Sequence, residues 1–211
     1  MTTTTTPRIV DVDSDGDLDL TVIADPTATT PTLTGATATT RRRGDHWTIT
    51  IPTPHAPAIQ AGHITATTIH VTVTGARPRR PRAVLRVPAT TVVRTRTAGR
   101  ITTTGPLAEL AVTGNVDVHV DVVGRMTANT TGHVTVDTIT GASTLMTTTG
   151  TITVHQGGRA DHLIATTGHI TYTPGPTTTR VTARTTTGNI NLPAAPGVDA
   201  HLATTTGHIT R

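Results

Sequence analysis

The feature that most constrains the fold of this chain is a short repeat built around glycine. Threonines precede the glycine, and one polar residue followed by Ile or Val comes after it. The repeat glycines are Gly114, Gly132, Gly150, Gly168, Gly188 and Gly207, which lie 18, 18, 18, 20 and 19 residues apart. A fixed period of this length is typical of a solenoid, in which each repeat buries its apolar face only by stacking on its neighbours.

Each repeat contains two stretches in which apolar and polar residues alternate with the period of a β-strand. The second residue after the glycine is Val116, Val134, Ile152, Ile170, Ile190 or Ile209, and the fourth is Val118, Val136, Val154, Tyr172 or Leu192. We expect both positions to point inward. A second strand precedes the next glycine. Five residues before that glycine stand Leu145, Leu163, Ala183 and Leu202, whereas Met126 stands six residues before Gly132.

The composition favours the same architecture. The 211 residues include no Phe, one Trp and one Tyr, so a compact globule would lack the aromatic side chains that usually fill its core. Thin layers of Val, Ile and Leu in a solenoid need no such residues, and the many Thr residues favour strands over helices. We predict an all-β, single-stranded β-solenoid with rungs of about 18–20 residues. The alternative is an antiparallel β-sandwich made of hairpins.

The sequence divides into a less regular part, residues 1–98, and the regular repeats, residues 99–211. Strand-like alternation also occurs in the first part, at residues 17–25, 46–52, 63–73 and 83–88, between loops rich in Pro, Thr and Arg. These strands would form either the opening rungs or a small β cap. A cap would cover one end of the stack, where exposed strand edges otherwise promote aggregation.

These segments resemble the bacterial putative-adhesin family of β-strand repeat proteins, a domain of unknown function. Residues 130–136, 147–154, 166–172, 185–192 and 204–210 match its Thr-rich, Gly-containing repeat, residues 16–22 its opening strand, and residues 83–89 its Leu/Val-Pro-Ala strand. The usual Asp after the repeat glycine is replaced here by His, Thr or Asn. The resemblance implies a β-solenoid without known catalysis, and so an adhesin-like interaction module. All 17 basic residues are Arg, which also indicates a high-GC bacterial or phage source.

An aspartate cluster near the N-terminus is a candidate calcium loop. Asp11, Asp13, Asp15 and Asp19 could supply carboxylate oxygens around the turn at Gly16. An EF-hand loop would also need a Glu at its twelfth position and flanking helices, and the sequence predicts neither. The other interpretation is a strand–turn–strand with exposed aspartates, so calcium binding stays open and we assign no metal site.

Three histidines share one repeat position, directly after the glycine. They are His133, His169 and His208, with Thr151 and Asn189 at the same position in the intervening repeats. Stacking would place consecutive histidines two rungs apart, roughly 9.6 Å at Cα. That separation is too large for shared ligation of one zinc ion at about 2 Å per bond. We predict a solvated polar column.

Arginines are concentrated at residues 77–100, with a further run at residues 41–43. The first group comprises Arg77, Arg79, Arg80, Arg82, Arg86, Arg94, Arg96 and Arg100. Such a segment could bind nucleic acid or another acidic polymer through phosphate or similar anionic groups. The aromatic platforms that bind single strands are missing, so we do not expect nucleic acid as the partner and interpret these residues as a solvated surface.

The carboxylates do not form the pattern of a polysaccharide-cleaving β-helix. Glu109 is the only Glu, and the aspartates of the repeats fall at different repeat phases; they are Asp117, Asp121, Asp137, Asp161 and Asp199. Glycoside hydrolysis needs two carboxylates at a set separation. We therefore predict a non-enzymatic protein without a cofactor, and keep a polysaccharide-active β-helix as the remaining alternative.

The expected partners and location follow from what surrounds the repeats. The last rung would stop just after Ile209 without an evident cap, so we expect self-association through the solenoid ends. No segment is long and apolar enough to span a membrane, and the start of the chain does not resemble a signal peptide. We expect a cytoplasmic location by default, with association to a surface as the alternative.

Overall fold

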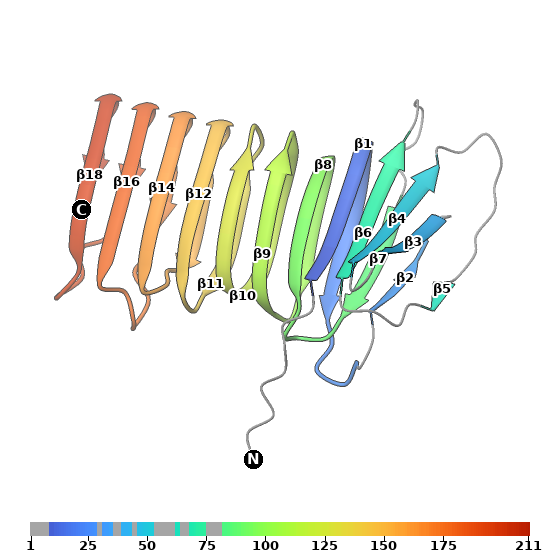
Figure 1. Cartoon of the computed structure of the whole chain (residues 1–211). Coiled ribbons are helices and arrows are strands. Elements are labelled where there is room, and N and C mark those ends of the chain that lie inside the picture. The colour runs from blue at the N-terminus through green and yellow to red at the C-terminus, as the bar shows by residue number, and fades with distance from the viewer. Residues whose placement is uncertain are drawn as a thin grey trace, which may run out of the picture.

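The computed structural model describes residues 9–28, 31–35, 39–43, 46–52, 62–63, 68–74 and 82–211. These residues form an all-β solenoid of about seven turns, which Figure 1 shows from the side. The predicted β-solenoid is confirmed, and the antiparallel sandwich is not the fold. In the part of the chain that the structure describes, no helix has the length and apolar character needed to cross a bilayer.

Each regular rung consists of a long strand, a corner and a short strand. The long strands are β12 (Ala142–Thr149), β14 (Ala160–Thr167), β16 (Arg180–Thr187) and β18 (Asp199–Thr206). The short strands are β11 (Val134–Ile139), β13 (Ile152–Gln156), β15 (Ile170–Tyr172), β17 (Ile190–Asn191) and β19 (Ile209–Thr210). Each strand pairs in parallel with its counterpart one rung away. We call the two resulting sheets the long-strand stack and the short-strand stack.

Three longer strands extend both stacks towards the N-terminal part. They are β8 (Val92–Thr104), β9 (Pro106–Gly114) and β10 (Val116–Thr130). The first half of β10 pairs with β11 in the short-strand stack, and its second half pairs with β12 in the long-strand stack. Because β8 is continuous from residue 92 to 104, the boundary drawn from the sequence between residues 98 and 99 falls inside a strand.

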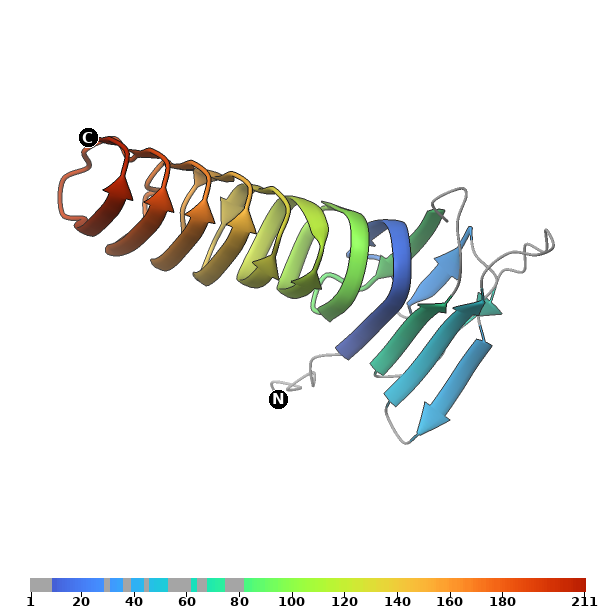
Figure 2. The same cartoon turned by 90° about the horizontal axis from the view of Figure 1, so that it is seen from above.

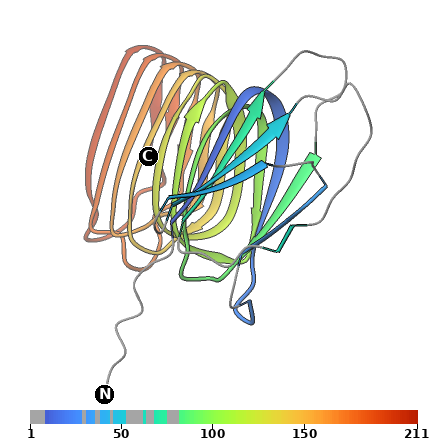
Figure 3. The same ribbon diagram turned by 45° about the vertical axis from the view of Figure 1, so that its right-hand side comes forward.

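The core is a set of inward columns between the two stacks. Leu145, Leu163 and Ala183 form one column with no exposed surface. Val134, Ile152, Ile170 and Ile190 form another, also without exposed surface. The period of two in each strand places these residues on one side of the backbone, so every rung contributes a thin apolar layer. Figure 3 shows the rungs as closed loops around this interior.

Five of the six repeat glycines stack directly on one another at a corner of the rung. A Cβ atom placed on Gly150, Gly168, Gly188 or Gly207 would approach or overlap the carbonyl oxygen of the preceding glycine in the column. Four of these five glycines also have positive φ, which favours Gly over any other residue. The repeat therefore needs glycine mainly because consecutive backbones approach too closely for a side chain.

Gly114 does not belong to this column, and the register expected for the first repeat is wrong. Val118, not Val116, pairs with Val134, an offset of 134 − 118 = 16 residues instead of 18. Likewise Ala128, not Met126, pairs with Leu145. A shift of two residues keeps the same face of a strand inward. The apolar alternation in the sequence therefore cannot reveal that this rung is shorter.

The threonines before each glycine have two different roles. The first of the three points inward at the corner, and its hydroxyl donates a hydrogen bond to the glycine carbonyl one rung back. These bonds run from Thr147 to Gly132 (2.7 Å), from Thr185 to Gly168 (3.1 Å) and from Thr204 to Gly188 (3.0 Å). The last threonines of the tracts, Thr149, Thr167, Thr187 and Thr206, pair with one another along the long-strand stack.

The first strand of the sequence lies inside the solenoid and not at its end. Strand β1 (Ile9–Ala24) pairs in parallel with β8 on one side and with β6 (Thr68–Thr74) and β7 (Arg82–Val87) on the other. Beyond them lie β2 (Thr32–Thr34), β3 (Thr39–Arg43), β4 (His46–Pro52) and β5 (Gly62–His63), partly in antiparallel pairs. In Figure 2 these strands splay away from the regular coil.

Replacing Gly168 with Ala tests the close approach at the corner. We expect Gly168→Ala to lower the free energy of unfolding by about 3 kcal/mol or more, because the new Cβ would overlap the backbone of Gly150. Gly197→Ala is the control, since Gly197 also has positive φ but has nothing within 4 Å of the added Cβ. It should cost only about 1–2 kcal/mol. Urea denaturation measures both, and equal losses would contradict the interpretation.

Candidate functional site

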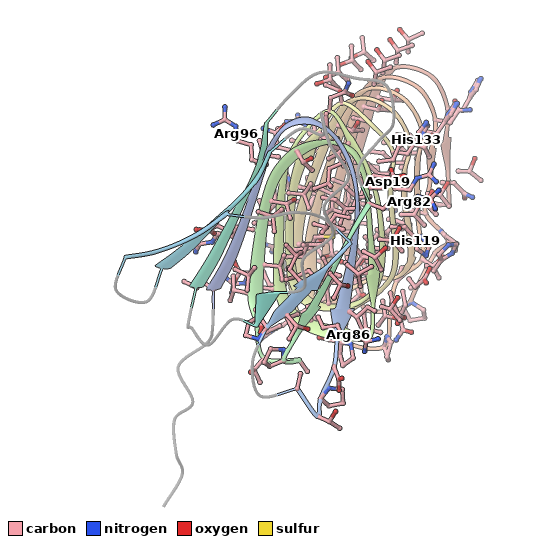
Figure 4. The ribbon with its side chains drawn as sticks, turned by 90° about the vertical axis from the view of Figure 1, so that its right-hand side faces the viewer. Asp19, Arg82, Arg86, Arg96, His119 and His133 are labelled. Atoms are coloured by element: carbon pink, nitrogen blue, oxygen red, sulfur yellow. The ribbon has the colours of Figure 1, made fainter. Side chains whose placement is uncertain are left out.

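The residues that follow the corner glycines, together with the residues that pair with them towards the N-terminal part, form one outward column along the short-strand stack, which we call the polar ladder. In spatial order it consists of Arg82, Asp19, Arg100, Asp117, His133, Thr151, His169, Asn189 and His208. Figure 4 looks along the solenoid from the N-terminal side and shows Asp19, Arg82 and His133 on the same side of the molecule. The structure thus places the three predicted histidines in one column.

Side chains of the ladder are hydrogen-bonded to the next rung. Four of them accept a bond from the backbone N–H of the following ladder residue: Asp117 Oδ1 from His133 (2.9 Å), His133 Nδ1 from Thr151 (3.0 Å), His169 Nδ1 from Asn189 (3.0 Å) and Asn189 Oδ1 from His208 (2.9 Å). When Nδ1 of an imidazole accepts a hydrogen bond, Nε2 is the ring atom that remains as donor. The ladder therefore presents imidazole N–H donors in fixed orientations.

Sequence reasoning placed the histidines in a column but missed this role. The sequence did contain a signal for it, because Asp117, His133, His169 and Asn189 all carry an acceptor atom at the δ position. An acceptor at that position can bond the backbone N–H of the next rung. Among the described residues, no group of three or more His, Asp or Glu side chains is arranged to hold a metal ion.

A second outward column runs beside the ladder, and we call it the hydroxyl column. It contains Thr21, Thr102, His119, Thr135, Thr153, Thr171, Asn191 and Thr210. From residue 133 onward, neither the ladder nor the hydroxyl column contains Asp, Glu or Arg. In this part of the solenoid the two columns present hydroxyl, amide and imidazole groups at the rung spacing of about 4.8 Å, and Asp137 lies at the next outward position of β11.

The aspartates of the proposed calcium loop do not form a loop. Residues 9–24 are one strand with a register shift between Asp13 and Asp17. Asp11 pairs with Arg94 in the part of β8 that continues into the long-strand stack, whereas Asp19 pairs with Arg100 in the part that continues into the short-strand stack. The two carboxylates therefore belong to different stacks, and the side chains of residues 13–17 lie outside the described part.

The arginines of segment 77–100 are divided between the two faces. Arg82 and Arg100 flank Asp19 in the ladder, beside a shallow depression of about 290 Å³. Arg94 and Arg96 belong to the other half of β8, and Figure 4 shows Arg96 on the opposite side of the molecule from Arg82. Arg77, Arg79 and Arg80 lie outside the described residues. The described arginines thus do not form one continuous basic surface.

Carboxylates of the repeats contact separate partners on different rungs. Asp121 accepts a hydrogen bond from the backbone N–H of Gly105 at 2.9 Å. Asp137 lies between His119 and His155, with N–O distances of 3.8 and 4.0 Å. Asp199 contacts Arg180 at 3.1 Å and His201 at 3.2 Å. Glu109, on β9, pairs in register with Val92 and Arg125. These contacts give each carboxylate a local structural or electrostatic role.

One carboxylate, Asp161, is buried among hydroxyl groups inside the solenoid. It accepts hydrogen bonds from Ser143 Oγ (2.6 Å), the N–H of Gly158 (2.7 Å) and the hydroxyl of Tyr172 (2.6 Å). Ser143, Asp161 and Tyr172 are each at most 5% exposed. Buried titratable groups often mark catalytic sites, but structural networks shift pKa values as well. Here the bonds join β12, β14 and β15, which belong to two successive rungs, and include the backbone N–H of Gly158.

The pH dependence of Tyr172 tests this buried cluster. Burial, together with the hydrogen bond to Asp161, raises the pKa of Tyr172 above its ordinary value of 10.0. The folded state therefore holds the neutral phenol, and its stability is full below pH 10 and falls as the pH rises above that value. Because Tyr172 is the only Tyr, its phenolate absorbance should appear together with loss of the β-sheet circular dichroism. Ionisation near pH 10 with intact circular dichroism would contradict this.

A second prediction concerns the ladder. Replacing His169 with Ala removes the acceptor for the Asn189 amide, so we expect a loss of about 0.5–1.5 kcal/mol in unfolding free energy and faster hydrogen exchange at that amide. His169→Asn is the matched control, because Asn189 accepts the equivalent bond one rung further on. It should retain the slow exchange. Identical exchange in both variants would show that the imidazole bond is not made.

No protein-family model, curated protein or solved structure matches this chain. The resemblance to the bacterial putative-adhesin repeats therefore stays a prediction. The function has to be argued from the chemistry of the two outward columns and from the scaffold that orders them.

Proposed function

We propose that this protein is a non-enzymatic, adhesin-like interaction module that binds a repetitive, uncharged, hydrogen-bonding partner on its short-strand face. The observation that carries the proposal is the polar ladder, in which side chains are fixed by hydrogen bonds to the next rung. The partner would be a polymer or surface rich in hydroxyl groups.

Pre-organisation supports this proposal. A flexible surface side chain loses rotamer freedom when it binds, at a cost of about 0.5–1.5 kcal/mol for each side chain that becomes immobilised. The imidazoles of His133 and His169 are already held through Nδ1, so part of that cost has been met during folding. In the hydroxyl column the parallel register repeats a threonine hydroxyl at Thr135, Thr153 and Thr171, which suits a partner that is itself repetitive.

The charge distribution favours a neutral partner over an acidic one. Binding of nucleic acid or another acidic polymer through the arginines of residues 77–100 is the alternative. It has less support, because Arg82 and Arg96 lie on opposite sides and Arg82 contacts Asp19 at 4.0 Å. A polysaccharide-active β-helix has less support still, since the carboxylates of the repeats contact separate partners on different rungs.

Binding to immobilised polymers tests the proposal. The triple variant Thr135→Glu/Thr153→Glu/Thr171→Glu places charges along the hydroxyl column and should reduce retention on an insoluble neutral glucan at least tenfold, which corresponds to about 1.4 kcal/mol. The control is Thr148→Glu/Thr166→Glu/Thr186→Glu, on exposed positions of the long-strand stack. It should change retention less than twofold.

Other outcomes would decide against this function. If the unmodified protein is not retained on the neutral glucan, or if both triple variants lose retention equally, the short-strand face is not the binding surface. Salt-dependent retention on heparin or DNA, lost in Arg82→Ala or Arg100→Ala, would instead support the alternative of an acidic polymer. A fall in glucan chain length would support the polysaccharide-active alternative.

A further inference from the structure

The shallow depression beside Asp19 crosses three adjacent strands, β7, β1 and β8, and has a volume of about 290 Å³. In each of these strands a charged ladder residue is followed, two residues later, by a short uncharged one. The charged residues on one side of the depression are Arg82, Asp19 and Arg100, and the half-buried residues on the other are Val84, Thr21 and Thr102. The hydroxyl column therefore continues into a hollow with one charged wall.

The lining of this depression contains two guanidinium groups and one carboxylate, so one positive charge is not balanced within it. Figure 4 shows Asp19 beside Arg82, and their side chains approach at 4.0 Å, which is longer than a hydrogen bond. Asp117 follows Arg100 in the ladder but does not line the depression. Its Oδ1 accepts a hydrogen bond from the backbone N–H of His133 on the next rung, at 2.9 Å.

The guanidinium of Arg100 is available to a ligand. Its side chain is exposed, and no hydrogen bond or ion pair joins it to another of the described residues. A guanidinium presents its N–H donors in a planar fork, which matches a carboxylate through two parallel hydrogen bonds. Thr21 and Thr102, beside it, carry hydroxyls that can both donate and accept. The lining thus combines a site for one anionic group with sites for hydroxyl groups.

We propose that the depression binds one acidic sugar unit, a uronate, within an otherwise neutral polysaccharide. Arg100 binds the carboxylate of that unit through its fork of N–H groups, and Thr21 and Thr102 bond hydroxyls of the same sugar ring. The volume lies at the lower end of the roughly 300–1,000 Å³ of small-molecule pockets, which suits a single unit. This inference rests on the function proposed above, because the rest of the polymer lies along the hydroxyl column.

The surroundings of the depression disfavour a polymer with a charge on every unit. Beyond Arg100, neither the ladder nor the hydroxyl column contains another Arg. Asp117 comes next in the ladder, and Asp121 and Asp137 lie at outward positions of β10 and β11. A polyanion that continued along the two columns would meet these carboxylates without further guanidinium groups. An isolated uronate followed by neutral units avoids that repulsion.

Retention on two insoluble glucans tests the proposal. One is the neutral polymer, and the other is the same polymer with a small fraction of its C6 hydroxyls oxidised to carboxylates. We expect about tenfold stronger retention on the oxidised glucan, as one bidentate charged contact would give. Arg100→Gln should bring the ratio of the two retentions close to one. Arg96→Gln is the matched control, since it removes the same charge from the opposite side of the molecule, and it should leave the ratio unchanged.

A second variant separates a specific contact from diffuse attraction. Arg100→Lys keeps the charge but lacks the planar fork, so it should lose most of the gain on the oxidised glucan. An unchanged gain in Arg100→Lys, a gain that persists in Arg100→Gln, or equal losses in Arg100→Gln and Arg96→Gln would overturn the proposal.

Failure of the uronate site and failure of the proposed function give different results. Retention on both glucans with a ratio near one in the unmodified protein would overturn the uronate site alone. Retention on neither glucan would overturn both. Retention on the oxidised glucan only, lost in Arg100→Gln and kept in Arg96→Gln, would support the uronate site and contradict binding of a neutral polymer.

Discussion

The close approach of glycine backbones at one corner of the rung is the contact on which the rest of this structure depends. Each glycine from Gly150 onward lies so near the carbonyl of the preceding one that a side chain cannot fit between them. The inward threonine of the tract donates to the glycine carbonyl, as Thr147 does to Gly132. The next residue's N–H is satisfied by a ladder side chain. The close approach at this corner thus accounts for the Thr-Gly-polar motif, although Ala165 replaces the inward threonine in the rung before Gly168.

The same corner connects the scaffold to the surface that we propose as functional. A ladder side chain that accepts a bond from the next rung stabilises the stack and is held in place by it, so structure and surface chemistry cannot be separated at His133 or His169. Thr135, Thr153 and Thr171 of the hydroxyl column follow from the same register. Whatever binds there meets a surface whose spacing is set by backbone hydrogen bonds and not by loops.

Sequence reasoning predicted the architecture well because a solenoid is specified by local periodicity. It predicted the candidate site less well, because the site depends on strand register and on contacts between residues that are far apart in the sequence. The two-residue shift at Val118 is invisible to a pattern with a period of two. Asp11 and Asp19 lie in different stacks because β1 runs from one stack into the other. Arg82 and Arg96 likewise lie on opposite sides of the molecule, which the sequence does not show. Asp161 was assigned no role, although it is the buried acceptor for Ser143 and Tyr172.

By itself the sequence determined the repeat length, the inward Val, Ile and Leu columns and the need for glycine at the corner, because these depend on each unit and its nearest neighbours. Only the tertiary structure decided where β1 lies. Its place between β8 and the pair β6 and β7 joins residues that are tens of positions apart, as in the pairing of Val10 with Ile69 and Val93. Parallel strands accept any neighbour with the same inward alternation, so the spatial order of rungs is a property of the folded chain.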